Sequence, residues 1–369
     1  MSGQLGESGL ASDEVLEVLD LCLECRACKS ECPVGVDVAR FKSEFLAEYW
    51  AKHGTPLRAL LMGNIGRLSK YVSRFSSLAN CIGGAAPVRR INQLIFGIDK
   101  RRILPSWRSP TFANCFPRQN QPHNDSVLLF NDTFTNYFEP EIGLAAVRVL
   151  NKVGFTVESK PYLCCGRTLI SQGLLRQARH NAQMLTQVFY PFAAKGKNIL
   201  FCEPSCLSAV QEDNPSLLRG EAQAQAQVLA NSCMLFEDFL ERHLQANSAS
   251  LPISAGPSKI IFHGHCHQKA MGLDVTAKAL LSRIPKAVVV DADAGCCGMA
   301  GSFGYMRDHY ELSRAIGERK LFPICRQAAN DSIVVAAGTS CRHQVAHFTG
   351  MVPVHPATLF DQLLHTSNE

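Results

Sequence analysis

The chain has little charge, few aromatic residues and no long apolar run. Charged residues make up 19% of its 369 residues and aromatic residues 8%. No run approaches the roughly 18 apolar residues of a membrane-spanning helix, and residues 1–20 hold acids without Lys or Arg, which excludes the basic start of a signal peptide. Since 46% of the residues are hydrophobic, we expect globular domains. Without an apolar span or a signal-peptide start in the sequence, we expect them in the cytoplasm.

Cysteine is the residue present in excess. Sixteen cysteines would suit disulfides only in an oxidising compartment, usually in a small secreted domain, and the sequence indicates neither. Twelve of them lie in short motifs, which is how metal ligands are distributed. We expect the other four to be small buried apolar side chains; they are Cys81, Cys115, Cys233 and Cys325.

The first cysteine motif is CLECRACKSECPVGVD at residues 22–37. Its spacing, C-x2-C-x2-C-x3-C followed by proline, is the run that binds a [4Fe-4S] cluster in bacterial ferredoxins, whereas zinc sites pair two separated C-x2-C motifs. The predicted ligands are Cys22, Cys25, Cys28 and Cys32. Two-cluster ferredoxins have a second such run, which this sequence lacks. Cys32 therefore either closes this cluster or reaches a second one shared with a partner.

From about residue 122 the sequence alternates predicted strands and helices, and its landmarks repeat. CCG occurs at 164–166 and again 132 residues later, and Ser-Cys occurs at 205–206 and again 135 residues later. We infer an internal duplication of one α/β unit, joined by a linker at 244–258. The predicted strands are 126–132, 155–159, 198–201, 259–264, 287–292 and 332–338, and the predicted helices between them include 141–153, 173–189 and 308–328.

The fold class is therefore predicted as α/β with three domains. Residues 1–121 form a small helical ferredoxin-like domain with a basic helical extension. Residues 122–250 and 251–369 form two pseudo-repeated cysteine-rich α/β domains. Parallel strands are expected in both, so that ligand-bearing loops gather at the carboxyl ends of the strands.

Each α/β half offers four further thiols as metal ligands. Successive side chains diverge, so adjacent cysteines do not easily reach one ion, but they can bind different atoms of a multinuclear cluster. Thiolates suit iron–sulfur clusters and zinc alike, and both remain open. The predicted ligands are Cys164, Cys165, Cys202 and Cys206 in the first half, and Cys266, Cys296, Cys297 and Cys341 in the second.

Histidines surround one of these cysteines in HGHCHQK, residues 263–269. Alternation along an extended loop would direct two of the three imidazoles, those of His263, His265 and His267, to one side. They either bind metal or relay protons, or they are hydrogen-bonded loop histidines. The nearby GMAGSFGY at 298–305 lacks the Lys-Ser/Thr of a phosphate loop; its glycines let the backbone approach a cluster.

Residues 51–118 are strongly basic, with twelve Lys or Arg against the single acid Asp99. Such a segment can lie on an anionic membrane surface, which would make the protein peripheral at the inner face of a membrane, or it can dock an acidic partner. The alternative is the solvated face of an ordinary helical subdomain. No nucleic-acid-reading module accompanies the charge. Apolar residues at helical spacing within the segment are Leu61, Ile65, Leu68, Val72 and Phe75.

These motifs together resemble the iron–sulfur portion of FAD-linked 2-hydroxyacid dehydrogenases, the group that includes glycolate oxidase iron–sulfur subunits. A more distant likeness runs to the cysteine-rich second subunit of heterodisulfide reductase and to the third subunit of anaerobic glycerol-3-phosphate dehydrogenase. Motifs that carry the resemblance are the run at 22–37, CCGRTLISQGLL at 164–175, EPSCL at 203–207, HGHCHQKA at 263–270, GCCGMAGSFGY at 295–305 and GTSCRHQV at 338–345.

The resemblance implies an oxidoreductase component that passes electrons from FAD on a partner chain or domain, through clusters here, to a quinone or another carrier. The hydroxyacid site would lie on that partner, and this chain would be inactive alone. The fullest form of the cysteine-rich unit has a lone cysteine before CCG; the first half shows FNDTFT at that place. Alternatives are a zinc-stabilised interaction module and a thiol/disulfide redox component like that of heterodisulfide reductase.

Overall fold

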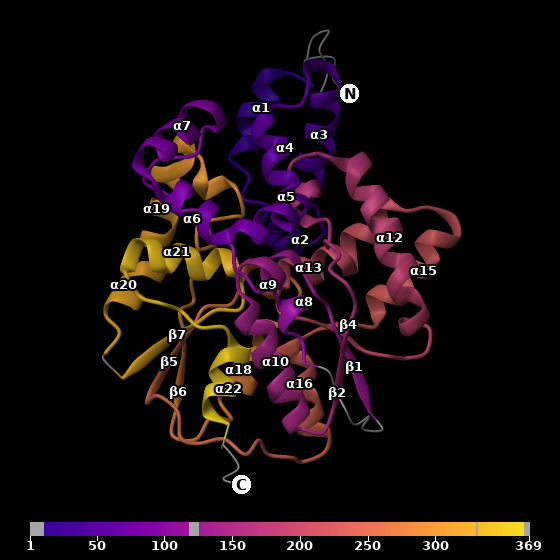
Figure 1. Ribbon diagram of the computed structural model, residues 1–369, viewed down its shortest axis with the longest axis vertical. Coiled ribbons are helices and arrows are strands. Elements are labelled where there is room, and N and C mark those ends of the chain that lie inside the picture. The colour runs from indigo at the N-terminus through magenta and orange to yellow at the C-terminus, as the bar shows by residue number, and fades with distance from the viewer. Residues whose placement is uncertain (1–10, 118–124, 330, 365–369) are drawn as a thin grey trace.

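The computed structural model describes residues 11–117, 125–329 and 331–364 (Figure 1). A helical N-terminal part precedes two α/β halves, each built on a parallel sheet. The first sheet has the strand order β2-β1-β3-β4 and the second β6-β5-β7, which confirms the α/β class. The strands are β1 (Ser126–Leu129), β2 (Thr156–Ser159), β3 (Ile199–Phe201), β4 (Cys233–Leu235), β5 (Lys259–Phe262), β6 (Val288–Asp291) and β7 (Ser332–Val335).

Helices make up most of the remaining described chain. Those before the first sheet are α1 (Asp13–Asp20), α2 (Ala27–Glu31), α3 (Val38–His53), α4 (Leu57–Gly63), α5 (Ile65–Val72), the 3-10 turn η1 (Ser73–Phe75), α6 (Ser76–Gly84), α7 (Ala86–Phe96) and α8 (Phe112–Cys115). No helix in the described ranges combines the length and apolarity needed to cross a membrane.

The helices of the first half connect its strands and continue into the second half. They are α9 (Thr133–Tyr137), α10 (Pro140–Lys152), α11 (Arg167–Ser171), α12 (Leu175–Ala193), α13 (Pro204–Ser208), the π-helical turn η2 (Ala209–Asp213), α14 (Asn214–Leu217), α15 (Gly220–Asn231) and α16 (Phe236–Ala246). The last of these extends into the predicted linker, which is therefore shorter than expected.

The second half repeats this plan with shorter connections. Its helices are α17 (Cys266–Ala270), α18 (Asp274–Leu281), the 3-10 turns η3 (Phe303–Tyr305) and η4 (Arg307–His309), α19 (Tyr310–Glu318), α20 (Leu321–Arg326), α21 (Thr339–Thr349) and α22 (Pro356–Leu363). The helix predicted at 308–328 is broken between α19 and α20, where Pro323 cannot donate the amide hydrogen bond that would continue the preceding turn.

Strand pairing gives the two halves equivalent topologies. β1 pairs with β2 and β3, and β5 pairs with β6 and β7 in the same way. Leu128 lies opposite Ile199 in the first sheet, and Ile261 lies opposite Val334 in the second. The equivalent strands are therefore β1 and β5, β2 and β6, β3 and β7, as the inferred duplication requires. β4 is an edge strand that the sequence analysis missed.

One apolar core joins the two halves. Leu129 and Phe262, at equivalent positions of β1 and β5, are both fully buried in the same cluster. α10 packs against α22, and α16 against α18, and Figure 1 shows these four helices between the two sheets. The opposite face of each sheet has a cluster of its own, which contains Cys165 and Cys206 in the first half and Cys297 and Cys341 in the second.

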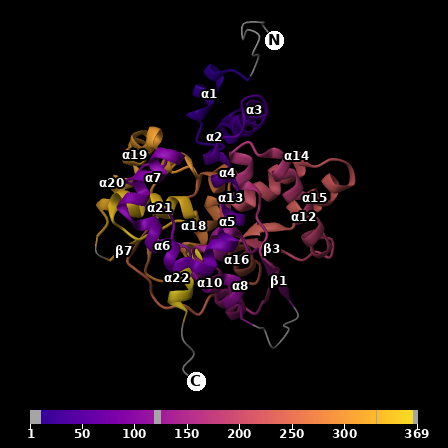
Figure 2. The ribbon, with the colours of Figure 1, turned by 45° about the horizontal axis from the view of Figure 1, so that its top comes forward.

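The N-terminal helices cover the carboxyl ends of both sheets. Figure 2 shows α1 and α3 projecting from the rest of the molecule, while α4 and α5 run across it. A short helix α2 lies between α1 and α3 and carries part of the first cysteine run. This arrangement places the run above the two cysteine-rich halves; the predicted domain boundaries remain predictions.

Candidate metal centres

The first cysteine run is a loop with two residues in the left-handed conformation, Glu24 at φ 52° and Arg26 at φ 63°. Backbone amides point at its sulfurs. The Glu24 amide donates to the Cys22 sulfur (3.5 Å), and the Val38 amide donates to the Cys28 sulfur (3.4 Å). Such N–H···S bonds favour the thiolate that binds metal.

Cys32 differs from the other three cysteines of the run. Backbone amides of Val36, Val34 and Gly35 surround its thiol and lower its pKa, whereas burial raises the pKa of Cys22 and Cys25. Pro33 and the valines beside Cys32 are exposed, Val34 by 83%. Cys32 thus sits in a surface loop that stabilises its thiolate.

Buried charges anchor this loop to the first α/β half. Arg26, 2% exposed, pairs with Asp213 (2.5 Å) and with Glu212. Arg167, which directly follows CCG, donates to the carboxylate of Glu24 (2.7 Å). Because breaking a buried pair leaves an uncompensated charge, these contacts hold the run in place.

A histidine anchors the same loop to the second half. Nε2 of His267 donates to the carbonyl of Glu24 (3.1 Å), and Nδ1 accepts from the hydroxyl of Ser208 (2.5 Å). His267 therefore carries its proton on Nε2. It follows Cys266 in α17, a helix that packs against both α2 and α13. The neighbouring Cys266 thiol adds to burial in raising the pKa of Cys25, so the first run and the second-half site are close.

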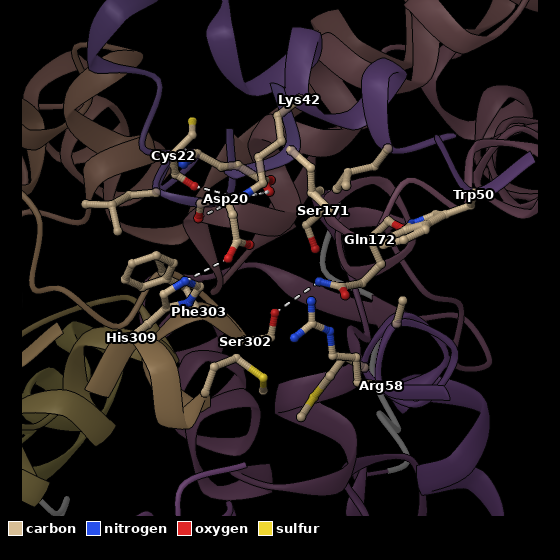
Figure 3. A pocket seen from close by; sticks show the side chains of 18 residues that line it. Asp20, Cys22, Lys42, Trp50, Arg58, Ser171, Gln172, Ser302, Phe303 and His309 are labelled. Atoms are coloured by element: carbon tan, nitrogen blue, oxygen red, sulfur yellow. Dashed lines mark hydrogen bonds and ion pairs between the residues drawn. The ribbon is translucent and has the colours of Figure 1, made fainter. Parts of the chain in front are cut away.

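A small cavity of about 80 Å³ lies where the three parts meet, with Cys22 at one end (Figure 3). His309 donates to Asp20 across it (2.8 Å) and stacks on Phe303. Gln172 of the first half donates to Ser302 of the second (3.0 Å). The cavity thus gives the edge of the first run a surrounding of mixed polar and apolar side chains.

In the first half, three of the four predicted cysteines come together. Cys165 donates to the sulfur of Cys206 at 2.9 Å, and both are buried in one cluster. Gly166, at φ 91°, directs its amide to the sulfur of Cys164 (3.4 Å). Burial raises the pKa of Cys206 to about 12, so its thiolate forms only with a compensating positive charge such as a metal.

The fourth, Cys202, lies on the other face of the sheet. Side chains alternate along a strand: Ile199 and Phe201 face the cluster of Cys165 and Cys206, while Leu200 and Cys202 face the core shared by the two halves. The structure therefore separates Cys202 from the set with which the sequence grouped it.

In the first half, the hydroxyl of Thr133 lies where the second half has the thiol of Cys266. By strand register, Thr133 occupies in the first half the position of Cys266 in the second, and both open a short helix after a side-chain N-cap, Asp132 and His265 respectively. Thr133 hydrogen-bonds Cys164 and lies 3.0 Å from the hydroxyl of Tyr162. The first site is thus three thiols and a threonine, a substitution marked in the sequence only by FNDTFT.

In the second half all four predicted cysteines converge. Hydrogen bonds link Cys266 to Cys296, Cys296 to Cys297 and Cys297 to Cys341. The Gly298 amide donates to the sulfur of Cys296 (3.3 Å), and a side chain on Gly298 would strike the Ser313 carbonyl. Glycine at this position therefore lets the loop pack closely against the backbone of α19.

His263 also reaches this set. One of its ring nitrogens and the sulfurs of Cys297 and Cys341 all lie within 4.8 Å of one another. Burial lowers the pKa of His263 to about 3, which keeps the imidazole neutral. His265 instead caps α17 by accepting from the His267 amide (3.1 Å). His265 and His267 are thus hydrogen-bonded at the start of α17, and Nδ1 of His265 also lies 4.0 Å from the Cys266 sulfur. His263 is the one of the three whose ring nitrogens have no such partner and whose ring faces Cys297 and Cys341.

The four lone cysteines divide evenly. Cys233 and Cys325 are buried among apolar residues, as expected. Cys81 is exposed and Cys115 is only partly buried, so the prediction was wrong for these two. Cys81 lies on the outer side of α6, where Leu78 and Ile82 are also exposed. None of the sixteen cysteines, all within the described residues, forms a disulfide.

Comparisons with known proteins agree with this chemistry. Residues 260–346 match the family described as CCG: Cysteine-rich domain. The chain is 29% identical over 314 residues to the third subunit of anaerobic glycerol-3-phosphate dehydrogenase of Escherichia coli K12, covering 84% of this chain and 77% of the relative. It is 24% identical over 343 residues to the glycolate oxidase iron-sulfur subunit of the same organism, covering 89% and 78%.

A third relative is much longer. The chain is 26% identical over 358 residues to D-2-hydroxyglutarate dehydrogenase of Escherichia coli K12, covering 94% of this chain but 34% of the relative. The chain thus spans about a third of that enzyme. The expected resemblance to iron–sulfur components of dehydrogenases and oxidases is confirmed.

Proposed function

We propose that this chain is an electron-transfer component that binds a [4Fe-4S] cluster at its first cysteine run and passes electrons from a FAD-containing dehydrogenase partner to a quinone or another carrier. The proposal is supported by relatives that are components of oxidoreductases, one of them named an iron-sulfur subunit. Its main structural support is that the first run is anchored to both halves, with Cys25 beside Cys266.

The chain's own residues supply the surroundings that tune such a site. An iron–sulfur cluster, when bound, accepts and returns one electron at a time. Amide hydrogen bonds to the sulfurs, burial and nearby charge set its potential. In this chain the groups that would set the potential are the amides of Glu24 and Val38 and the buried ion pair of Glu24 with Arg167.

The site in the second half suits a multinuclear centre. Cys296 and Cys297 are adjacent, and both bond to further thiols, so the four sulfurs can surround several metal atoms. We propose an iron–sulfur cluster here, with zinc as the alternative. The residues that act on a hydroxyacid or a related substrate would lie on the partner.

The basic segment supports contact with a membrane surface. α5 buries its small residues: Gly66 faces Tyr162 and Thr133 of the first half, and Ser69 accepts a hydrogen bond from the Trp107 indole. Its larger neighbours stay outside: Phe75 is 69% exposed, and Leu94 of α7 is 82% exposed. Exposed apolar side chains among Lys and Arg are typical of segments that lie in the interface of an anionic bilayer. α4, which precedes α5, contributes Ala59 and Met62 to the cavity that Cys22 lines, so that position would bring a lipid-soluble carrier toward this cysteine.

Electron transfer is tested by mixing the anaerobically purified chain with its flavoprotein partner and a hydroxyacid substrate. We expect bleaching of the iron–sulfur absorption and the appearance of a reduced-cluster electron paramagnetic resonance signal, both lost in Cys25→Ser. Cys81→Ser, which changes an exposed cysteine outside the motifs, serves as the control. Clusters that stay oxidised, or zinc in excess of iron with little sulfide, would refute the proposal.

Membrane contact is tested separately with vesicles that contain phosphatidylglycerol. Lys70 of α5 and Arg74 of η1 are exposed. Reversing both to Glu should weaken binding at least about tenfold, since each basic residue near an anionic surface contributes about 1 kcal/mol. The matched control reverses Arg176 and Arg179, exposed on α12. Equal binding by both double variants would exclude this surface.

A further inference from the structure

His263 occupies a special position at the carboxyl end of β5. Alternation along the strand sends Phe262 into the core shared by the halves, and Ile261 into the cluster of Cys297 and Cys341. His263 follows with the same orientation as Ile261. Its imidazole therefore points at the thiols, which agrees with the 4.8 Å limit on the separation of the three ligand atoms.

The imidazole is buried without a hydrogen-bond partner. His263 is 1% exposed, and neither of its ring nitrogens has a partner among the described residues. Leaving such a group unsatisfied costs roughly 1–3 kcal/mol. The other buried histidines of these loops are all bonded: His265 to the His267 amide, His267 to Ser208, and His355 to the carbonyl of Cys202.

The first half provides an internal comparison. Strand register makes Phe130 the equivalent of His263, and Phe130 packs in the cluster of Cys165 and Cys206. Both donors that distinguish the second half, His263 and Cys266, are thus replaced in the first, by a phenylalanine and Thr133. An apolar side chain satisfies that position in the fold, so the strand itself does not require a histidine there.

We propose that His263 is a metal ligand of the second-half site, acting beside Cys266, Cys296, Cys297 and Cys341. The inference rests on the proposed function only in requiring that this half binds a metal. Neutral imidazole is a good ligand for iron and zinc, and a metal would satisfy one of the two unpartnered nitrogens. The first half, with three thiols and a hydroxyl, offers fewer metal-binding donors than the second.

The consequence for redox chemistry is a change of potential. Replacing thiolate by neutral imidazole lowers the negative charge around the iron, and histidine-ligated clusters have higher potentials than all-cysteine clusters. The second-half centre would then accept electrons more readily than an otherwise equal centre with a fifth thiolate. His263→Cys should retain the metal and lower the reduction potential.

The experiment detects whether a histidine nitrogen coordinates the metal. The full chain is purified anaerobically with ¹⁴N- or ¹⁵N-labelled histidine, and iron and zinc per chain are measured. For iron, we expect an imidazole nitrogen coupling in electron spin echo spectra of the reduced protein that changes with the label and disappears in His263→Ala and His263→Cys. For zinc, the same variants should lose a nitrogen neighbour in X-ray absorption.

His355→Ala is the matched control, because it removes an equally buried but hydrogen-bonded histidine; it should keep the nitrogen signal. His263→Cys keeps the test valid if His263→Ala does not fold. No histidine nitrogen at the metal in the wild type, or a signal that persists in both His263 variants, would overturn the inference. Failure of the proposed function is distinct, since it would appear as no reduction of the first run by the flavoprotein.

Discussion

At the scale of single residues, the face of a strand decides which cysteines act together. Cys202 and Cys206 are four residues apart and both buried, yet one faces the shared core and the other faces Cys165. The sequence suggested a C-x3-C pair because spacing does not reveal where a strand ends. Phe201 is the last residue of β3, and the strand's alternation carries over to Cys202.

This separation predicts different outcomes for matched substitutions. Cys202→Ala should leave metal per chain unchanged and lower the free energy of unfolding by only about 1 kcal/mol, a typical core effect. Cys341→Ala removes an equally buried thiol but should release metal. Metal analysis and urea denaturation of the two variants provide the comparison. Metal loss in Cys202→Ala would show that Cys202 is a ligand after all.

Residue-level prediction is most direct where spacing alone suggests the chemistry, and the structure brings the predicted thiols of the second half together. The run that begins at Cys22 and the pair at Cys296 are readable because adjacent or regularly spaced thiols have few other uses. His263 was less readable: three histidines share one short motif, and only the burial of each ring and its partners distinguishes a bonded loop histidine from one without partners.

At the scale of elements, contacts between helices and loops attach the N-terminal part to the halves. The loop after α11 touches α3 at Gly173, where an added side chain would lie 2.8 Å from the Leu46 carbonyl carbon and 2.9 Å from the Ala47 nitrogen. Trp50 of the same helix donates to the carbonyl of Gln172 (3.0 Å). The approach of two backbones here leaves no room for a side chain.

Gly173→Ala should therefore be more destabilising than a glycine substitution in open space. Gly154 is the matched control, since it also has a positive φ (94° against 70°) but nothing within 4 Å of an added side chain. Both variants incur the backbone strain of a positive φ; only Gly173→Ala incurs overpacking, a further roughly 1–3 kcal/mol. Thermal unfolding of the two proteins would reveal the difference, and equal losses would mean that α3 adjusts freely.

Element prediction was best for the longer apolar strands. It was weakest for the short edge strand β4 and for the burial of α5. The six predicted strands are present because apolar runs bounded by turn residues have few alternatives. β4 was missed because its three residues, Cys-Met-Leu, lie directly between α15 and α16 with no proline or glycine to separate them from the helical pattern. α5 buries its small residues Gly66 and Ser69, and the apolar residues Ile65, Leu68 and Val72, whose spacing predicted the helix, are only partly buried.

At the scale of the whole molecule, buried polar contacts connect the halves. Glu139, before α10, binds Arg342 of α21 (2.5 Å) and accepts from Thr339 (2.9 Å). Burial alone would raise the pKa of Glu139, but the guanidinium of Arg342 outweighs it and lowers the pKa to about 2. Glu203 accepts from the Thr339 amide (2.9 Å), so the first half holds the start of α21 from two sides.

This pair should make stability depend on pH. Because the folded pKa of Glu139 lies below its unfolded value of 4.5, its contribution is present above about pH 4.5 and is lost as the pH falls toward 2. Glu139→Gln should cost about 3 kcal/mol at pH 7 and flatten that acid dependence. Asp308→Asn, in an exposed pair with Arg307, should change neither; denaturant titrations from pH 7 to pH 3 make the comparison. An unchanged acid dependence in Glu139→Gln would assign it to other carboxylates.

The overall arrangement was only partly predictable. Duplication and parallel sheets follow from the repeated landmarks and from strand-helix alternation. That the halves share a core through α10 and α22, and that Arg26 and Glu24 fix the first run between them, depends on pairings across more than a hundred residues, which local patterns do not encode.

The divergence of the two halves also makes the molecule its own reference. Phe130 and Thr133 stand on a framework equivalent to that of His263 and Cys266. Introducing Phe130→His and Thr133→Cys together would transplant the second half's extra donors onto the first while leaving the rest of the chain unaltered. The first half of this duplicated fold thereby serves both as a control for the second-half site and as a scaffold on which a further redox centre could be engineered within the same polypeptide.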